Sequence, residues 1–248
     1  MVNRYIRHGI VLCITLFLVI AIPARYETSS AQTAKQSALV HKSRVNGLAF
    51  GDAFHKYKET YLYTFYLMPQ YEVQLVPGSG NIIFEERMNK DLQKSTHDAL
   101  AYIRANADML GIAKHTLRAY DIYIYIHDDG IEGSYTGTSA GVTIALGLIS
   151  AFSGQPISSQ YATTGEIDRD GNIFSIGGIA SKIEAAWQNG ASHIILPRAN
   201  KKDTDRFPDC AKKLTFIWTD TIEEILDQIH FKKQYHSDTV FYTNSIVL

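Results

Sequence analysis

The chain has 248 residues, a formal net charge of −1 and 46% hydrophobic residues, which fits an N-terminal segment followed by one domain with a sizeable core. The near-neutral charge without a basic stripe excludes a typical nucleic-acid-binding protein. Cys13 lies in the N-terminal apolar run and leaves Cys210 alone, so a disulfide framework and a cysteine-rich metal site are excluded. The sequence also has no His-Glu-x-x-His motif. We expect neither a metal nor a cofactor.

The N-terminal segment has the pattern of an export signal. Arg4 and Arg7 precede an apolar run over residues 9–22. This run has the length of a signal-peptide core and is short for a membrane span, and the basic residues before it favour export of the rest of the chain. We expect residues 1–26 to be a signal peptide or a signal anchor. The globular part would then be exported across the cytoplasmic membrane or anchored in it, with residues 27–42 as a polar linker.

The globular part, residues 43–230, alternates between strand and helix patterns. The elements predicted in chain order are strands at 57–68 and 71–76, a helix at 88–110, a strand at 121–126, a helix starting at Ser139, strands at 161–167 and 173–176, a helix around Lys182, strands at 193–196 and 214–218, and a helix at 221–229.

Turn and cap residues set the boundaries of these elements. Pro69 is predicted to turn a hairpin between the first two strands, and Gly111 to cap the helix at 88–110. Thr219 or Asp220 is expected to cap the last helix. The order of elements predicts a single α+β (α/β-like) domain with mixed β-sheets and flanking helices. Residues 231–248 form a C-terminal extension, in which residues 240–248 either add an edge strand or stay loose.

Ser139 lies between glycines, in Gly137-Thr138-Ser139-Ala140-Gly141, just ahead of an apolar helical stripe. This position predicts a first-turn or N-cap serine. Backbone N–H groups at a helix start are unsatisfied and favour negative charge, so they are suited to stabilising an oxyanion. A plain N-cap serine, which is a far commoner feature, fits the same pattern.

Lys182 falls on the apolar stripe of its own predicted helix, together with Ile179, Ile183 and Ala186. We therefore expect its amine to be partly desolvated, which lowers the pKa of a lysine and lets the neutral amine take a proton from a hydroxyl. The alternative is a lysine whose stem packs against the core while its amine reaches water.

Four short motifs follow one another along the chain. They are Pro77-Gly78-Ser79-Gly80, Gly137-Thr138-Ser139-Ala140-Gly141, Thr164-Gly165-Glu166 and Gly177-Gly178-Ile179-Ala180-Ser181-Lys182. In this order they resemble the proteolytic domain of Lon proteases, which are Ser–Lys peptidases. The resemblance covers residues 43–229. The Ile-Glu-Ala-Ala run directly after Lys182 is more similar to the archaeal membrane-bound type.

The resemblance implies that Ser139 is the nucleophile, Lys182 its general base, and Thr164 a supporting residue that hydrogen-bonds near the lysine. The implied activity is that of a serine endopeptidase acting through an acyl-enzyme. Family members carry an ATPase module, whereas this sequence has no phosphate-binding loop of the Gly-x-x-x-x-Gly-Lys-Ser/Thr type. We expect ATP-independent hydrolysis. Thr136 and Thr138 stand where many bacterial members have an acidic residue and a proline.

The expected partners are unfolded polypeptides or peptides as substrates. The resemblance adds a homo-oligomer, as a hexameric ring, and the missing ATPase points to a separate unfoldase. The membrane is a partner if the N-terminal segment is retained. No nucleic acid is expected.

Two other functions fit parts of the sequence. Gly137-x-Ser139-x-Gly141 also matches the nucleophile elbow of α/β-hydrolase esterases, with Asp203 and His230 available by composition to complete a triad. That elbow requires a strand running straight into the serine, whereas residues 128–138 are polar and contain glycines. A catalytically inactive Lon-like domain that serves as an assembly or adaptor module is the second alternative.

Overall fold

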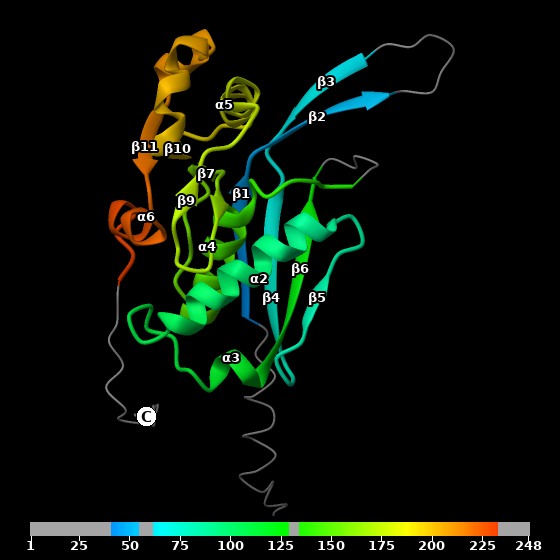
Figure 1. Ribbon diagram of the computed structural model, residues 1–248, viewed down its shortest axis with the longest axis vertical. Helices are drawn as coiled ribbons and strands as arrows, with labels where there is room; N and C mark the ends of the chain where they lie inside the picture. Colours follow the sequence, from blue (N-terminus) through cyan, green and yellow to red (C-terminus); the bar gives the residue numbers. More distant parts are fainter. Residues whose placement is uncertain (1–40, 55–61, 129–133, 233–248) are drawn as a thin grey trace, which may run out of the picture. The chain divides into compact units, whose positions relative to one another are not determined.

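A computed structural model describes residues 41–54, 62–128 and 134–232 of the chain (Figure 1). The strands of its main sheet are β1 (His41–Gly47), β4 (Gln70–Pro77), β5 (Ile82–Phe84), β6 (Tyr120–His127), β7 (Tyr161–Thr163), β10 (His193–Pro197) and β11 (Thr215–Thr219). They form a seven-stranded sheet in the order β11-β10-β7-β1-β4-β6-β5. Strands β11, β10, β7 and β1 are parallel, whereas β4 runs antiparallel to both of its neighbours. The predicted mixed α+β fold is confirmed.

The helices are α2 (Lys90–Ala105), α3 (Thr116–Ala119), α4 (Gly141–Ser153), α5 (Ile179–Gln188) and α6 (Ile222–Gln228), with 3₁₀ turns η1 (Arg198–Arg206) and η2 (Asp209–Lys213). Helix α4 lies against β1 and β4, and α2 packs on α4. Because α4 is enclosed between the sheet and α2, nearly all of its residues are buried. Figure 1 shows α2 crossing the view in front of this sheet.

The buried side chains form two hydrophobic clusters. The first joins α2, α4, α6 and the strands β4 and β6, with members such as Leu92, Ile124 and Leu146. The second joins α5 with β10 and includes Ile183 and Ile194. Strand β7 lies between them, since Ala162 belongs to the second cluster while Tyr161 packs against the first.

The hairpin predicted at Pro69 is wrong. Strand β3 (Leu62–Leu67) does not pair with β4 but with β2 (Ala49–Phe54), in a separate two-stranded sheet. The register of the β2–β3 pair continues that of the β1–β4 pair. The segments 41–54 and 62–77 are therefore one long antiparallel pair that changes sheet near Pro69, whose carbonyl accepts the Gly47 N–H at 2.8 Å. In Figure 1 the β2–β3 ribbon extends away from the main sheet.

Other boundaries shift by a few residues. Helix α2 ends at Ala105 with Asn106 as its C-cap, so Gly111 does not cap it. The predicted strand at 161–167 is divided into β7 and β8 (Glu166–Ile167), and β8 pairs with β9 (Ile173–Phe174). Helix α6 is capped by Thr221 rather than by Thr219 or Asp220, because its hydroxyl accepts the Glu224 N–H at 3.2 Å.

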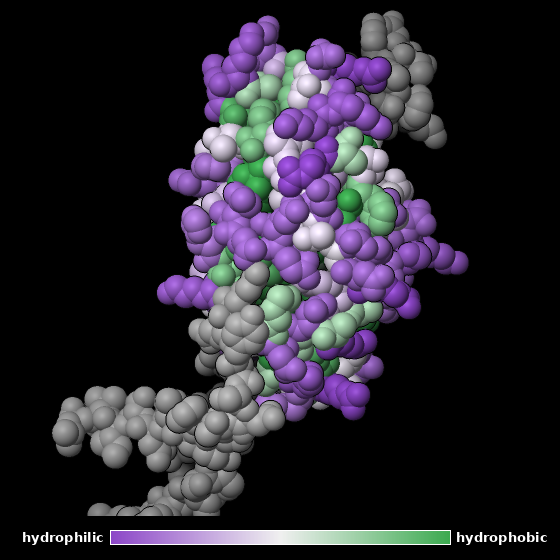
Figure 2. Space-filling model, turned by 60° about the vertical axis from the view of Figure 1, so that its left-hand side comes forward, coloured by the Kyte–Doolittle hydropathy of each residue, from purple (hydrophilic) through white to green (hydrophobic). Residues whose placement is uncertain are grey.

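The surface seen in Figure 2 is mostly hydrophilic, and hydrophobic residues emerge on it in small separate groups. Within the residues that the structure describes, no helix combines the length and the hydrophobicity needed to cross a membrane. His41 and Lys42, which we predicted to end the linker at 27–42, belong to β1 instead. The hydrophobic run at 9–22, the rest of the linker at 27–40 and the segment at 240–248 lie outside the described residues. The predictions for them are therefore not tested.

Candidate active site

Ser139 lies in the turn that leads into α4. The helix itself begins at Gly141 with Ala140 as N-cap, so Ser139 precedes the first turn that we predicted for it. Gly137 has φ +87°, a backbone conformation that favours glycine. A Cβ on Gly141 would lie 2.7 Å from Ile167 Cγ2, which shows how closely the turn packs on β8. The two glycines thus fix the position of the half-buried serine.

Lys182 reaches this serine from the second hydrophobic cluster. It lies in the first turn of α5, and only 1% of its surface is exposed. The Lys182 Nζ atom donates hydrogen bonds to Ser139 Oγ and to Thr164 Oγ1, both at 2.9 Å. These distances are within the range for direct proton transfer between the amine and the serine hydroxyl.

Burial changes the protonation of Lys182. Desolvation disfavours the ammonium form and lowers the pKa of the Lys182 amine from 10.5 to about 7. A substantial fraction of the amine is therefore neutral near neutral pH. In the neutral form the amine has a lone pair, so the serine hydroxyl can donate to it across the same 2.9 Å contact.

Thr164 and Gly165 bind the main chain of the turn that contains Ser139. The Thr164 hydroxyl and the Gly165 N–H both donate to the Ser139 carbonyl, at 3.0 and 2.7 Å. The Val142 N–H in turn donates to the Gly165 carbonyl at 3.0 Å. A Cβ on Gly165 would lie 2.7 Å from Val142 Cγ2, so there is no room for a side chain between Gly165 and the first turn of α4. Thr164 therefore contacts both Ser139 and Lys182.

Donors for an oxyanion lie beside the serine. Within the described part of the chain, the N–H groups of Ser139 and Ala140 donate to no main-chain acceptor. Both precede the N-terminus of α4, where the helix dipole favours negative charge. A carbonyl attacked by Ser139 Oγ would thus meet main-chain donors as its oxygen becomes charged.

One contact next to the nucleophile was not anticipated. The Thr138 hydroxyl donates to Glu166 Oε2 at 2.7 Å and so ties the residue before Ser139 to β8. We identified both residues from the sequence but assigned neither a role in the site. Part of this contact could have been suspected from the sequence. Glu166 belongs to the Thr-Gly-Glu motif, and in the serine motif Thr138 stands where many bacterial members have a proline. Thr136, the other departure from the bacterial pattern, is exposed.

The residues named for a hydrolase triad are not brought together. The Ser139 hydroxyl contacts Lys182, whereas Asp203 accepts a hydrogen bond from Asn200 and His230 follows α6. Strand β6 also ends at His127, well before the serine, as the mismatch with the nucleophile elbow predicts. Among the described residues, no three His, Cys, Asp or Glu side chains are grouped to hold a metal ion.

Comparison with known proteins identifies a matching family. Residues 39–232 match the family described as the Lon protease (S16) C-terminal proteolytic domain. The Lon protease of Syntrophomonas wolfei is 38% identical over 162 residues, which cover 65% of this chain and 20% of that protein. The Lon protease of Halothermothrix orenii is 35% identical over 159 residues, or 64% of this chain and 20% of the relative.

Lon protease 1 of Bacillus subtilis gives a similar result, with 34% identity over 157 residues, or 63% of this chain and 20% of the relative. The chain thus spans about a fifth of the length of the curated relatives it matches. The family match at 39–232 includes the region that contains Ser139, Thr164 and Lys182.

Proposed function

This chain belongs to the family of Lon protease (S16) C-terminal proteolytic domains, a family of serine-type peptidases, and we propose that it is an ATP-independent endopeptidase with a Ser139–Lys182 dyad. The observation that carries the proposal is the 2.9 Å contact between Ser139 Oγ and the buried Lys182 amine. The lowered pKa of that amine gives it the protonation state that a general base requires.

The proposed reaction has two halves. In the first, neutral Lys182 accepts the Ser139 Oγ proton while Oγ bonds to the peptide carbonyl carbon, and the N–H groups of Ser139 and Ala140 stabilise the oxyanion. The C–N bond then breaks as Lys182 gives its proton to the leaving amine. In the second, Lys182 takes a proton from water as the hydroxide attacks the ester carbon, the bond between that carbon and Ser139 Oγ breaks, and Lys182 returns the proton to Oγ. Thr164 orients the lysine amine throughout.

The substrates that we propose are unfolded polypeptides and peptides. The sequence contains no phosphate-binding loop of the Walker type, so nothing in it supplies ATP-driven unfolding. Unfolded casein should therefore be cleaved at the same rate with and without Mg-ATP, and a stably folded protein should be cleaved far more slowly. A rate that rises with ATP in the purified protein would contradict this part of the proposal.

The dyad is tested with matched variants on casein. Ser139→Ala and Lys182→Met should each reduce cleavage by at least about a thousandfold, because each removes a group that acts only in the reaction. As a control, Ser134→Ala replaces an exposed serine that precedes Ser139 in the chain, and this variant should cleave like the wild type. Lys182→Arg should stay inactive, since a guanidinium keeps its proton.

The outcomes separate the proposed function from its rivals. Full activity in both dyad variants would show that the assignment is wrong. A wild-type protein that cleaves nothing and whose Ser139 resists acylating reagents would instead support the assembly or adaptor module.

Assembly and location are two further parts of the proposal. We propose that the domain forms a homo-oligomer, and that the basic and apolar pattern at residues 4–22 directs the globular part out of the cytoplasm. Cell fractionation with N-terminal sequencing tests the location and shows whether the segment is removed. Light scattering of the purified protein measures its mass, and a monomer at micromolar concentration would contradict the oligomer.

A further inference from the structure

Strand β1 leaves part of one edge without a partner in the described residues. On one side β1 pairs with β4 from His41 to Asn46, whereas on the other side β7 pairs only with Asn46 and Gly47. The Gly47 N–H points to the β4 side, where it donates to the carbonyl of Pro69 just before β4, and the Leu48 N–H points to β7, where it donates to the Thr163 carbonyl. Main-chain groups alternate along a strand. Those of Lys42 and Arg44 therefore face the open edge.

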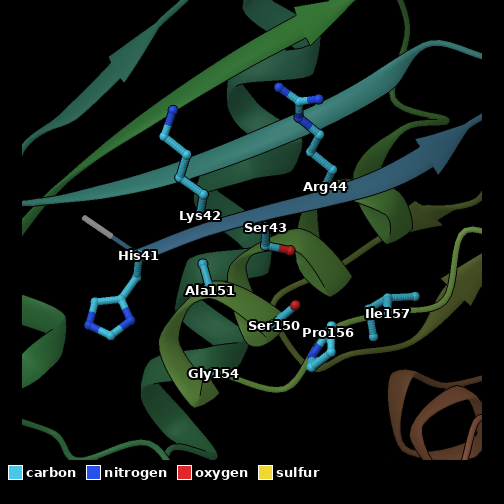
Figure 3. A pocket seen from close by; sticks show the side chains of 9 residues that line it. All are labelled: His41, Lys42, Ser43, Arg44, Ser150, Ala151, Gly154, Pro156 and Ile157. Atoms are coloured by element: carbon cyan, nitrogen blue, oxygen red, sulfur yellow. The ribbon is translucent and has the colours of Figure 1, made fainter. Parts of the chain in front are cut away.

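A cavity of about 310 Å³ lies along this edge. Its lining comes from β1, the end of α4 and the turn after that helix: His41, Lys42, Ser43, Arg44, Ser150, Ala151, Gly154, Pro156 and Ile157. Figure 3 shows His41 and Ser43 projecting from β1 on the side opposite to Lys42 and Arg44. Ala151, Pro156 and Ile157 give the cavity an apolar wall.

One polar atom in this cavity has no partner among the described residues. Only 7% of the surface of Ser43 is exposed, and its Oγ makes no hydrogen bond within the described structure. Buried hydroxyl groups are nearly always hydrogen-bonded, so an unpaired one calls for a missing partner. Ser43 is flanked by Lys42 and Arg44, whose N–H and C=O groups face the same edge. A polypeptide in extended conformation would offer partners to all of these groups.

The described chain ends beside this cavity. Helix α6 closes with His230 at φ +56°, an uncommon conformation for a residue with a Cβ, and the Phe231 N–H bonds back to the Leu226 carbonyl. Lys232 is then held by Gln155 through two hydrogen bonds of 2.9 Å, one in each direction between its main chain and the side-chain amide. Gln155 stands between Gly154 and Pro156 of the cavity wall. Lys232 thus lies next to the wall of the cavity.

The tail itself has the composition of a strand. Residues 240–248 are Val-Phe-Tyr-Thr-Asn-Ser-Ile-Val-Leu, rich in β-branched and aromatic residues and without a charged side chain. Such residues suit an apolar wall and a strand edge alike. We propose that the open edge of β1 and its cavity bind residues 240–248 of the same chain as an added strand. This proposal does not depend on the peptidase activity.

Hydrogen exchange at single amides tests the proposal, with the Ser139→Ala variant as parent so that the tail cannot be cut by the protein. Deleting residues 233–248 should accelerate exchange at the Lys42 and Arg44 amides by about tenfold or more. The amides of Ser43 and Val45 face β4 and serve as internal controls that should not change. A synthetic peptide of residues 233–248 should restore the protection.

A full-length pair of variants covers the case in which the deletion disturbs folding. Tyr242→Pro removes an N–H from the proposed strand and should accelerate exchange at Lys42 and Arg44, whereas Ser237→Pro, before that strand, should not. The proposal is overturned if Tyr242→Pro leaves both amides protected. It is also overturned if their protection falls on dilution, because the occupant would then be a second copy.

Discussion

At the scale of single residues, Lys182 dominates the behaviour of the site. Its side chain is almost fully buried, and desolvation lowers the pKa of its amine to about 7. A base acts only when unprotonated, so kcat/KM should increase about tenfold per pH unit below that pKa and level off above it. A pH profile of peptide cleavage between about pH 5.5 and 9 measures this. A flat profile would contradict the assignment of Lys182 as the base.

The same burial makes Lys182 costly for the fold. Its pKa is about 7 in the folded state and 10.5 in the reference state, so the unfolded chain binds the proton more tightly. Stability is therefore reduced most below pH 7 and recovers as the pH rises toward 10.5. Lys182→Met should raise the free energy of unfolding by roughly 1–3 kcal/mol at about pH 6 and by less at about pH 9. Denaturant unfolding at both pH values tests this, and a destabilised variant at the lower pH would contradict it.

Thr164 is expected to act as a positioning residue. It accepts from the Lys182 amine and donates to the Ser139 carbonyl, so Thr164→Val removes both contacts at nearly constant volume. We expect kcat to fall about ten- to a hundredfold with little change in KM, because the amine loses its orientation. Thr164→Ser should recover most of the loss. Equal damage from both substitutions would point to packing instead.

At the scale of elements, the patterns that could be predicted are those that depend on local periodicity. The apolar spacing around Ile183 predicts α5 and places Lys182 on its buried face, and the structure shows both. The change of sheet near Pro69 could not be predicted, because the local pattern of β3 does not specify whether it pairs with β2 or with β4. The Thr138–Glu166 contact depends on the tertiary approach of β8 to the turn that contains Ser139. Local sequence does not encode it.

The cap of α6 gives a prediction at this scale. Thr221→Ala removes the acceptor for the Glu224 N–H and should cost about 1 kcal/mol of stability. Thr221→Ser keeps the hydroxyl and should cost less. Thermal unfolding of the three proteins measures the difference. Cleavage should be unaffected, because α6 contributes no residue to the dyad, and a parallel loss of kcat would show that the helix supports the site.

At the scale of the whole molecule, the site lies where the two hydrophobic clusters meet. Ser139 leads into α4 of the first cluster, and Lys182 comes from α5 of the second. The dyad contact therefore requires both clusters to be folded. Contacts that only stabilise one cluster should change stability without changing the geometry of the dyad.

Tyr102 offers a test of this separation. Its ring is fully buried in α2, and its hydroxyl donates to Glu223 Oε1 of α6 at 2.6 Å. Tyr102→Phe removes that bond and should cost about 1–2 kcal/mol, a fall in Tm of a few degrees. Glu223 is partly exposed and can be hydrated in the variant. Because the lost bond joins α2 to α6 and the dyad bond joins Ser139 to Lys182, kcat below the unfolding transition should match the wild type. A kcat that falls with Tm would mean that the first cluster transmits its packing to the nucleophile.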